Sequence, residues 1–420
     1  MQIGIGISNL SDPVCATQKA IEKSINGIEG PPKAVIFLTT IQYKFNDGFS
    51  KSLKKIVEYF PNAEIIGGTV AGFASREGIF TKGVAIVVIN GEDVDVSIGI
   101  GHNTKKSPDI AGKNCARMIK NGLKKTKFPN KFFFMILSSA IVPDLPIIRR
   151  KRIIEGFPFI NQAVNIFDRV SSILQVGSGK DESVLSSVSE ELGDFSGIGG
   201  ASSDDLKLEE NYQFFKNRFF TNSVVCLGIA TKVSGDVKTS FGLKPTGKKF
   251  AITETSVSKY IVKKINGHSA VGEYLKIMGW NKKVLDDRLY RKVFYFPFVE
   301  NGIIEREIQP RMFGLIYGEN FVFPMKASSG NLEIYQSSGK DIIESNRNVV
   351  GVGKKSGLIV SCATRLETLG GKTYKIKEQV YDKLLDDYLI VYTAGEYSKQ
   401  KGENARCLYQ SDNALLFGLH

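Results

Sequence analysis

The sequence contains one pattern twice, and this repetition restricts the possible folds more than any other feature of the chain. Three blocks recur in the same order. They are residues 67–71 and 199–203, residues 81–89 and 221–229, and residues 97–100 and 240–243. The separation between matching blocks grows slowly along the chain, as insertions in loops would produce. We therefore predict an internal duplication, with copies at about 1–101 and 105–243.

Each copy combines a pair of glycines with an apolar run. Glycine adopts positive φ and lets backbones approach closely. We interpret four of these glycines as structural turns: Gly67, Gly68, Gly199 and Gly200. The apolar runs of the second block lie between turn signals and are typical of buried strands. In the second copy, residues 132–137 match 34–38, and a helix near 147–155 matches one at 49–59. An extra segment at 161–193 then precedes the second glycine pair.

A polar stretch with proline and glycine at residues 244–249 predicts a domain boundary. A chain of 420 residues is expected to form two or three domains. We predict one domain at 1–245, built from the two copies, and a second α/β domain at 246–420, where no third copy is visible. Strands and helices mix throughout, which predicts an α/β (mixed α+β) fold with mixed sheets flanked by helices. A four-layer α-β-β-α sandwich is one such arrangement for the N-terminal half.

Positive charge is concentrated in one part of the chain. The formal net charge is +13, and residues 105–152 hold thirteen lysines and arginines against two acidic residues. We interpret this region as the solvated face of a lysine-rich helix, because base-stacking aromatic residues are not interleaved with the charges. Binding of phosphates or nucleic acid through residues 105–152 is the alternative.

Composition and motifs argue against several classes of protein. No stretch approaches the ~20 apolar residues of a membrane span, and the first residues do not resemble a signal segment. Five scattered cysteines are typical of a reduced, cytoplasmic protein without a metal site. The sequence contains no P-loop, dinucleotide-binding or hydrolase signature. Of the three histidines, His268 begins a helix and is interpreted as a capping or surface residue, with a haem or metal ligand as the alternative.

The best candidate site residues lie in the C-terminal half, where two apolar strands end in polar groups. Ser361, Cys362 and Arg365 follow one strand, and Gly395 and Glu396 follow another. Strand ends beside loops are common places for ligand groups, and Arg can bind a carboxylate with two parallel hydrogen bonds. The Arg and the Glu could hold the two ends of an amino acid. The alternative is a structural salt bridge between them, with Cys362 as a buried core thiol.

Several of these motifs resemble the FIST family. The glycine pairs with their following strands, and the run from Gly197 to Phe215, are similar to the FIST N-terminal domain. Residues 266–270, 361–365 and 394–396 are similar to segments of the FIST C-terminal domain, and residues 409–419 to its final strand. This resemblance implies a sensory module that binds amino acids or similar metabolites. Some members bind haem, and many are fused to output domains that are not visible here.

The function expected from these features is a cytoplasmic sensory protein without catalysis or a metal cofactor, which binds a small ligand and signals to a separate partner protein. Its ligand-binding residues would be Ser361, Cys362, Arg365, Gly395 and Glu396. Three alternatives stay open: an enzyme with Cys362 as nucleophile, a haem-binding gas sensor, and a nucleic-acid-binding module.

Overall fold

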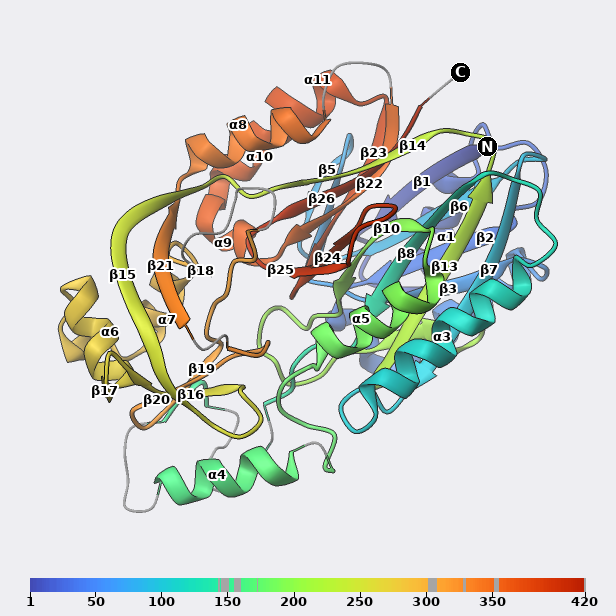
Figure 1. Cartoon of the computed structure of the whole chain (residues 1–420). Coiled ribbons are helices and arrows are strands. Elements are labelled where there is room, and N and C mark those ends of the chain that lie inside the picture. Colours follow the sequence, from blue (N-terminus) through green and yellow to red (C-terminus); the bar gives the residue numbers. More distant parts are fainter. Residues whose placement is uncertain are drawn as a thin grey trace.

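The computed structural model describes residues 1–142, 144, 151–154, 160–171, 173–300, 308–327, 330–350 and 355–418. Its fold is mixed α/β, as predicted, with mixed sheets covered by helices (Figure 1). Among the described residues there are three six-stranded sheets and one eight-stranded sheet.

The first sheet is built around the N-terminal segment. Its unit comprises β1 (Gln2–Ser8), α1 (Pro13–Ser24), β2 (Ala34–Thr39), α2 (Gly48–Tyr59), β3 (Glu64–Thr69) and β6 (Val84–Asn90). These strands lie in the order β1-β6-β2-β3. The β1–β6 and β6–β2 pairs are antiparallel, and the β2–β3 pair is parallel.

The second sheet repeats this order and these senses. Its unit comprises β7 (Val94–His102), α3 (Pro108–Gly122), β8 (Asn130–Leu137), α5 (Asp181–Leu192), β10 (Ser196–Ala201) and β13 (Ser223–Thr231). The order is β7-β13-β8-β10, with two antiparallel pairs followed by a parallel one. By this pairing β7 is the counterpart of β1, so the 97–100 block opens the second unit and does not close the first. The helix that matches α2 is α5, which lies inside the predicted extra segment. Most of the helix predicted at 147–155 lies outside the described residues, and the described part is wrong as a helix because it contains a short strand, β9 (Ile153–Ile154).

A third unit with the same topology is present, although no third copy is visible in the sequence. It comprises β14 (Gly235–Ser240), α8 (Gly339–Val350), β22 (Lys355–Cys362), β23 (Asp387–Thr393) and β26 (Asp412–Gly418). The order β14-β26-β22-β23 has the same succession of antiparallel and parallel pairs. Three short helices connect β22 to β23: α9 (Thr364–Leu369), α10 (Thr373–Ile376) and α11 (Asp382–Leu384). This sheet joins strands from both sides of residue 245.

Each unit sends a hairpin to the sheet of another unit. The hairpins are β4 (Gly72–Ser75) with β5 (Gly78–Phe80), β11 (Gln213–Phe215) with β12 (Arg218–Phe220), and β24 (Glu396–Lys399) with β25 (Arg406–Leu408). The first extends β23, the second extends β3 and the third extends β10. The exchange is therefore cyclic, and it ties the three units into one body.

The inner faces of the three sheets share one hydrophobic core. Alternate residues of the central strands point inward, for example Ile36 of β2, Phe134 of β8 and Val360 of β22. The intervening residues point outward under helices, such as Phe37 toward α1 and α2 and Ile359 toward α8. Strands that are apolar on both faces read as continuous apolar runs. Three sheets thus surround the centre, in place of the two sheets of the predicted sandwich.

The glycine pairs are not turns. Gly67 lies within β3 and Gly199 within β10, without positive φ. A Cβ at Gly67 would lie 1.7 Å from the Phe37 carbonyl oxygen, and one at Gly200 would lie 2.5 Å from the Thr393 side chain. Gly68 and Gly199 are similarly enclosed, so these positions require glycine because neighbouring groups come so close.

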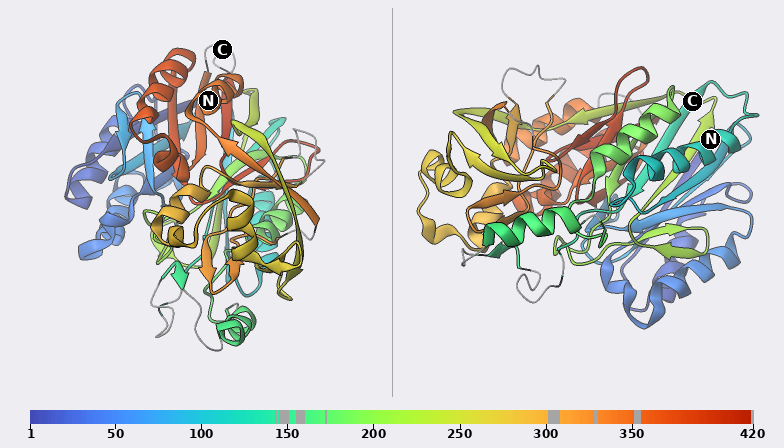
Figure 2. Two further views of the ribbon diagram at one scale, coloured as in Figure 1. Left: turned by 90° about the vertical axis from the view of Figure 1, so that its left-hand side faces the viewer. Right: turned by 60° about the horizontal axis from the view of Figure 1, so that its bottom comes forward.

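Seven strands of the eight-stranded sheet are inserted between β14 and α8, and the eighth, β9, comes from the chain between β8 and α5. Its strands are β15 (Leu243–Thr255), β16 (Ile261–Ile265), β17 (His268–Ser269), β18 (Phe298–Glu300), β19 (Leu315–Tyr317), β20 (Asn320–Val322), β21 (Gly330–Ser337) and β9 (Ile153–Ile154). The associated helices are α6 (Ala270–Met278), α7 (Asp287–Val293) and α4 (Ile160–Val170). Figure 2 shows α6 and α7 in a lobe at one end of the molecule, with α4 along its edge. Short 3-10 segments lie at Ile41–Asp47, Lys282–Val284 and Gly370–Lys372, and a π-helical segment lies at Lys377–Tyr381.

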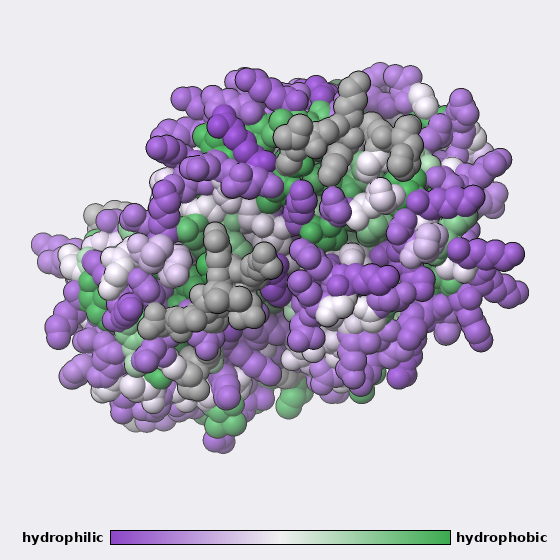
Figure 3. Space-filling model, turned by 45° about the horizontal axis from the view of Figure 1, so that its top comes forward, coloured by the Kyte–Doolittle hydropathy of each residue, from purple (hydrophilic) through white to green (hydrophobic). Residues whose placement is uncertain are grey.

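The basic region 105–152 is divided between the surface and the core. Arg117 and Lys120 lie on the exposed face of α3, 3.4 Å and 3.6 Å from carboxylate oxygens of Glu191. Lys105 is an exception to the prediction, because its side chain is 1% exposed. Arg149 and Arg150 lie outside the described residues. On the face drawn in Figure 3, hydrophilic residues predominate. No helix in the described part of the chain is long and apolar enough to cross a membrane.

Candidate functional site

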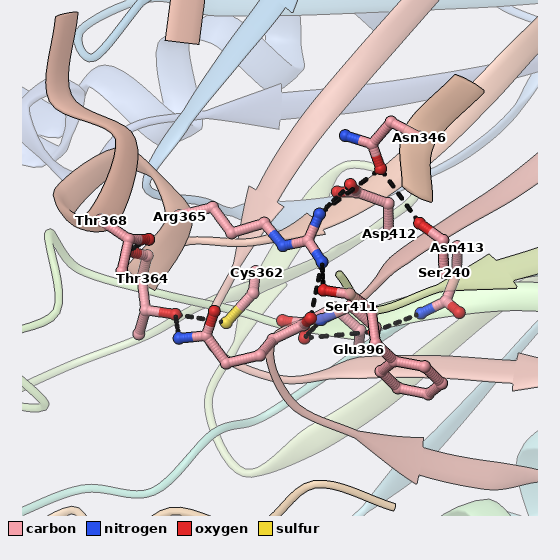
Figure 4. Close-up of polar contacts among 12 residues, drawn as sticks. Ser240, Asn346, Cys362, Thr364, Arg365, Thr368, Glu396, Ser411, Asp412 and Asn413 are labelled. Carbon is pink, nitrogen blue, oxygen red and sulfur yellow. Dashed lines mark hydrogen bonds and ion pairs between the residues drawn. The ribbon is translucent and has the colours of Figure 1, made fainter. Parts of the chain in front are cut away.

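The predicted site residues gather in one buried polar cluster at the ends of three strands (Figure 4). Cys362 ends β22, Arg365 lies in the first turn of α9, and Glu396 begins β24. The fold thus brings together residues separated by more than thirty positions. Ser361 is buried beside them, and Gly395 immediately precedes Glu396.

Both terminal nitrogens of the Arg365 guanidinium are bonded to protein groups, whereas its Nε has no partner among the described residues. The guanidinium forms an ion pair with Asp412 and donates to the carbonyl oxygens of Phe241 at 2.8 Å and Gln410 at 2.6 Å. Arg365 and Asp412 are 1% and 2% exposed. Arg365 therefore does form a structural ion pair, but its partner is Asp412 and not Glu396, as the alternative prediction had it. Asp412 opens the final strand, far from Arg365 in sequence, and sequence reasoning missed it.

Burial favours the uncharged forms of Glu396 and Cys362. Burial raises the pKa of Glu396 well above its usual range. One of its carboxylate oxygens accepts from the amide and hydroxyl of Ser411 at 3.4 Å, and the other has no partner among the described residues. Burial also raises the pKa of the Cys362 thiol, with the charge of Glu396 adding to the effect. Cys362 Sγ lies 2.9 Å from Thr364 Oγ1. A thiol in such surroundings is a poor nucleophile.

Glu396 has a counterpart in the second unit. Gln213 begins β11, as Glu396 begins β24, and its Oε1 accepts from the backbone amide of Ser223 at 3.1 Å. Ser223 and Ser411 stand at the start of the last strand of their units. A neutral amide performs the same bonding in the second unit, which indicates that this position joins strand ends in both units.

A hollow beside Arg365 is too small for a metabolite. Its volume is about 10 Å³, and it is lined by Arg365, Asp412 and Tyr381 among others. A single water molecule needs about 10–15 Å³ on this scale. A ligand gripped by Arg365 would therefore have to displace protein groups.

A larger cavity lies between the second unit, the third unit and the inserted sheet. Its volume is about 90 Å³, several times the minimum that one water molecule needs. Ser139 reaches it from the end of β8, Lys180 and Asp181 from the start of α5, and Thr364 and Ala394 from the third unit. Helix α4 and the inserted sheet complete its wall.

Asp181 is the most unusual polar group of this cavity. It is 3% exposed. Its Oδ2 accepts from the Tyr397 hydroxyl at 2.8 Å, and its Oδ1 has no partner among the described residues. Burial raises the pKa of Asp181 to about 6, while the Tyr397 hydrogen bond and the charge of Lys105 act in the opposite direction. A buried acceptor without a donor is rare in folded proteins and requires an explanation.

A lysine also lines this cavity. Lys180, adjacent to Asp181 in the chain, places Nζ 3.9 Å from the centre of the Tyr260 ring. Burial lowers the pKa of Lys180, and the charge of Asp168 partly offsets this effect. Asp168 itself accepts a hydrogen bond from Ser258. The Tyr260 hydroxyl has no partner among the described residues. Met312, Phe313 and Phe323 supply apolar walls.

These cavity residues were not predicted as site residues. Lys180 and Asp181 lie in the stretch interpreted as an extra segment. The one signal that could have found them is a charged pair after a glycine, at the start of a helix that follows an apolar strand. Thr364 and Ala394 are immediate neighbours of the predicted residues Arg365 and Gly395.

The comparisons define the class of protein. The model of the FIST N domain matches residues 33–268, more than half of the chain. The chain therefore belongs to the FIST family, a family of sensory modules that bind small ligands. The resemblance of the region beyond residue 268 to a FIST C-terminal domain stays a prediction.

No curated protein matches the sequence. Among solved structures, the chain is similar to a cyanuric acid hydrolase from A. caulinodans, with a TM-score of 0.37 and 5% sequence identity. That alignment covers 100% of this chain and 99% of the other. A similarity this weak carries no inference about function.

Proposed function

We propose that the protein is a sensor which binds a small zwitterionic metabolite, such as a short amino acid, in the cavity between the second and third units. The observation that carries this proposal is Asp181, a buried carboxylate in the cavity whose Oδ1 has no partner among the described residues, with Lys180 lining the same cavity. A zwitterion supplies the donors that Asp181 lacks and a carboxylate for Lys180. Charge-assisted hydrogen bonds of this kind are roughly twice as strong as neutral ones.

The size and lining of the cavity support the same class of ligand. A volume of about 90 Å³ suits a molecule of few heavy atoms. It is far below the ~300–1,000 Å³ of pockets for drug-sized molecules, which argues against haem at this place. His268 is exposed on β17, and no histidine is among the residues that line the described cavity.

The predicted signature residues take a supporting role in this proposal. Arg365 donates to the Gln410 carbonyl oxygen, and Gln410 Nε2 donates to Thr364 Oγ1 at 2.6 Å. Thr364 is part of the cavity wall. Arg365 would therefore position the wall through two hydrogen bonds, without touching the ligand. Occupancy would reach a separate signalling partner through the third unit, which contributes both this wall and β24.

Thermal shift with single amino acids (glycine, alanine, serine, threonine and aspartate) tests the proposal. Saturation at about 100 times Kd adds ~2.7 kcal/mol of stability. Asp181→Asn and Lys180→Met each remove one charge-assisted contact, worth ~1.5–3 kcal/mol, so affinity should fall about 10- to 100-fold. Asp194→Asn, which alters an exposed carboxylate 2.9 Å from Lys131, is the control. Equal affinities for the wild-type protein and the two cavity variants would refute the proposed site.

A further inference from the structure

One lysine of the predicted basic surface is instead buried against a serine. Lys105 follows β7 and Ser138 follows β8, and both side chains are at most 1% exposed. Lys105 Nζ lies 3.1 Å from Ser138 Oγ and 2.6 Å from Asn222 Oδ1. A hydroxyl and an amine at this distance can exchange a proton directly.

The surroundings of Lys105 favour a neutral amine. It forms no ion pair within the described part of the chain. Burial lowers the pKa of Lys105 to about 7, and the charge of Asp181 on α5 partly offsets this effect. The Tyr397 hydroxyl, which also lies near Asp181, donates its hydrogen bond to that carboxylate and carries no charge that could pair with Lys105. Near neutral pH a large fraction of Lys105 can therefore accept a proton, as a general base must.

The pair lies one residue behind the wall of the cavity described above, and neither Ser138 nor Lys105 is among the residues that line it. Ser139 and Ala140, the next residues after Ser138, line this cavity, and so does Asp181. A Cβ at Gly179 would lie 3.2 Å from the Ser138 carbonyl oxygen and 2.0 Å from Asp181 Oδ1. A side chain at position 179 would therefore collide with the Asp181 carboxylate.

The other two units show that the fold does not require this lysine. Thr40, Ser138 and Cys362 occupy equivalent positions. Their backbone amides donate to the carbonyl oxygens of Gly83, Ser223 and Ser411 at 3.1, 3.0 and 3.1 Å. Thr40 Oγ1 accepts from the backbone amide of Gly83, and Cys362 Sγ lies beside Thr364. Only Ser138 of the three is bonded to an amine among the described residues.

From this geometry we propose that Ser138 and Lys105 form a nucleophile–base pair that hydrolyses an ester or amide bond of a small molecule in the cavity. This inference rests on the proposed ligand cavity and goes beyond it, because the substrate would be an ester or amide of such a small metabolite. Serine–lysine pairs are a known variant of nucleophilic catalysis.

The reaction balances with water as the only co-reactant. The Lys105 amine takes the hydroxyl proton of Ser138 while Oγ bonds to the carbonyl carbon. The bond to the leaving nitrogen or oxygen then breaks, and the Lys105 ammonium gives its proton to that atom. Water next adds to the acyl carbon and transfers a proton to Lys105. The Ser138 ester bond breaks, and Oγ takes this proton back.

The test uses p-nitrophenyl acetate with the full chain between pH 6 and 9. We expect release of nitrophenolate above background and an acetyl group on the peptide that contains Ser138, detected by mass spectrometry after acid quench. Removal of a general base costs ~10²–10⁴-fold in rate, so Lys105→Met should lose at least about 100-fold. In the wild-type protein the cleavage rate should rise with pH as Lys105 loses its proton, and this rise should be absent in Lys105→Met. Ser138→Ala should lose the adduct as well as the rate.

Two matched controls separate this result from a general loss of structure. Thr40→Val removes the equivalent hydroxyl of the first unit, and Lys399→Met removes another buried lysine, bonded to the carbonyl oxygens of Gly193 and Phe195. Both should keep the wild-type rate. A wild-type protein with no Ser138 adduct and with the rate of Ser138→Ala at every pH overturns the hydrolytic proposal. Amino acid binding measured on Ser138→Ala decides the sensor proposal separately.

Discussion

Arg365 and Asp412 form an ion pair in which both side chains are almost completely removed from solvent. The two residues belong to α9 and β26, and the pair fixes the end of the last strand of the third unit against the helix that follows β22. The same guanidinium bonds the Gln410 carbonyl oxygen, from which the contacts continue to Thr364 on the cavity wall.

Breaking this pair should destabilise the fold strongly. Removing one partner of a buried ion pair typically costs ~3–5 kcal/mol, because the other charge stays buried alone. We expect Asp412→Asn to lose about that much free energy of unfolding in urea titrations. Asp194→Asn, which breaks an exposed pair with Lys131, should change it by less than about 1 kcal/mol. A loss for Asp412→Asn no larger than for Asp194→Asn would contradict the structural role of the pair.

A glycine within β3 should be irreplaceable for a steric reason. In Gly67→Ala the new Cβ would overlap the Phe37 carbonyl oxygen of the adjacent strand, so β2 and β3 must move apart. Overpacking of this kind costs ~1–3 kcal/mol or more. Gly371→Ala is the matched control, because nothing lies within 4 Å of its new Cβ and its φ is ordinary. Thermal melting of both variants measures the difference, and equal melting temperatures would show that β3 tolerates a side chain here.

The sequence predicted the parts of this fold whose signal is local. The apolar runs of β2, β6, β8 and β13 are buried on both faces, which is why they read as strands and why their repetition is visible. The third unit escaped prediction because about a hundred residues of the inserted sheet separate β14 from α8. Its strands also keep the apolar character of the other units, but of the repeated sequence blocks it carries only the one at 240–243, at the end of β14.

The candidate site was predictable only in part, because it depends on contacts between distant segments. The polar ends of β22 and β23 were visible, and they do lie together. Their distance from the cavity, however, is decided by Gln410 and Asp412, which no local pattern connects to Arg365. Lys105 was counted as a surface charge, since a count of charges does not reveal which lysine points inward.

The buried carboxyl of Asp181 should make stability fall as pH rises. Its pKa of about 6 in the folded protein exceeds the ordinary value of 3.8. The folded state therefore binds more protons between these two values, and stability present below pH 3.8 is lost as pH rises through about 6. Each unit of pKa difference corresponds to ~1.4 kcal/mol, so the loss is on the order of 3 kcal/mol. The side chain in Asp181→Asn cannot ionise. The free energy of unfolding of this variant, relative to that of the wild-type protein, should therefore rise by about that amount between pH 4 and pH 7.

Urea titrations at several pH values check this expectation. Asp194→Asn again serves as the control, since that exposed carboxylate has a lowered pKa, for which desolvation is outweighed by Lys131. If the free energy difference between Asp181→Asn and the wild-type protein stayed constant over this range, Asp181 would not be a buried, unpaired acid.

The buried amine of Lys105 should have the opposite pH dependence. Its pKa of about 7 in the folded protein lies below the ordinary value of 10.5. The unfolded state then binds more protons between these values, so the stability contribution is present above pH 10.5 and is lost as pH falls through about 7. At neutral pH the folded protein has lost most of this contribution, on the order of several kcal/mol by the same conversion. Lys105→Met removes the ionisable group, and its stability relative to the wild-type protein should be greatest near pH 6 to 7 and smaller near pH 10. Lys120→Met, at a position 51% exposed, should show no such trend.

The same variant also bears on catalysis. If the Lys105→Met protein melts no lower than the wild-type protein at neutral pH and yet fails to cleave p-nitrophenyl acetate, it has lost a base and not its fold.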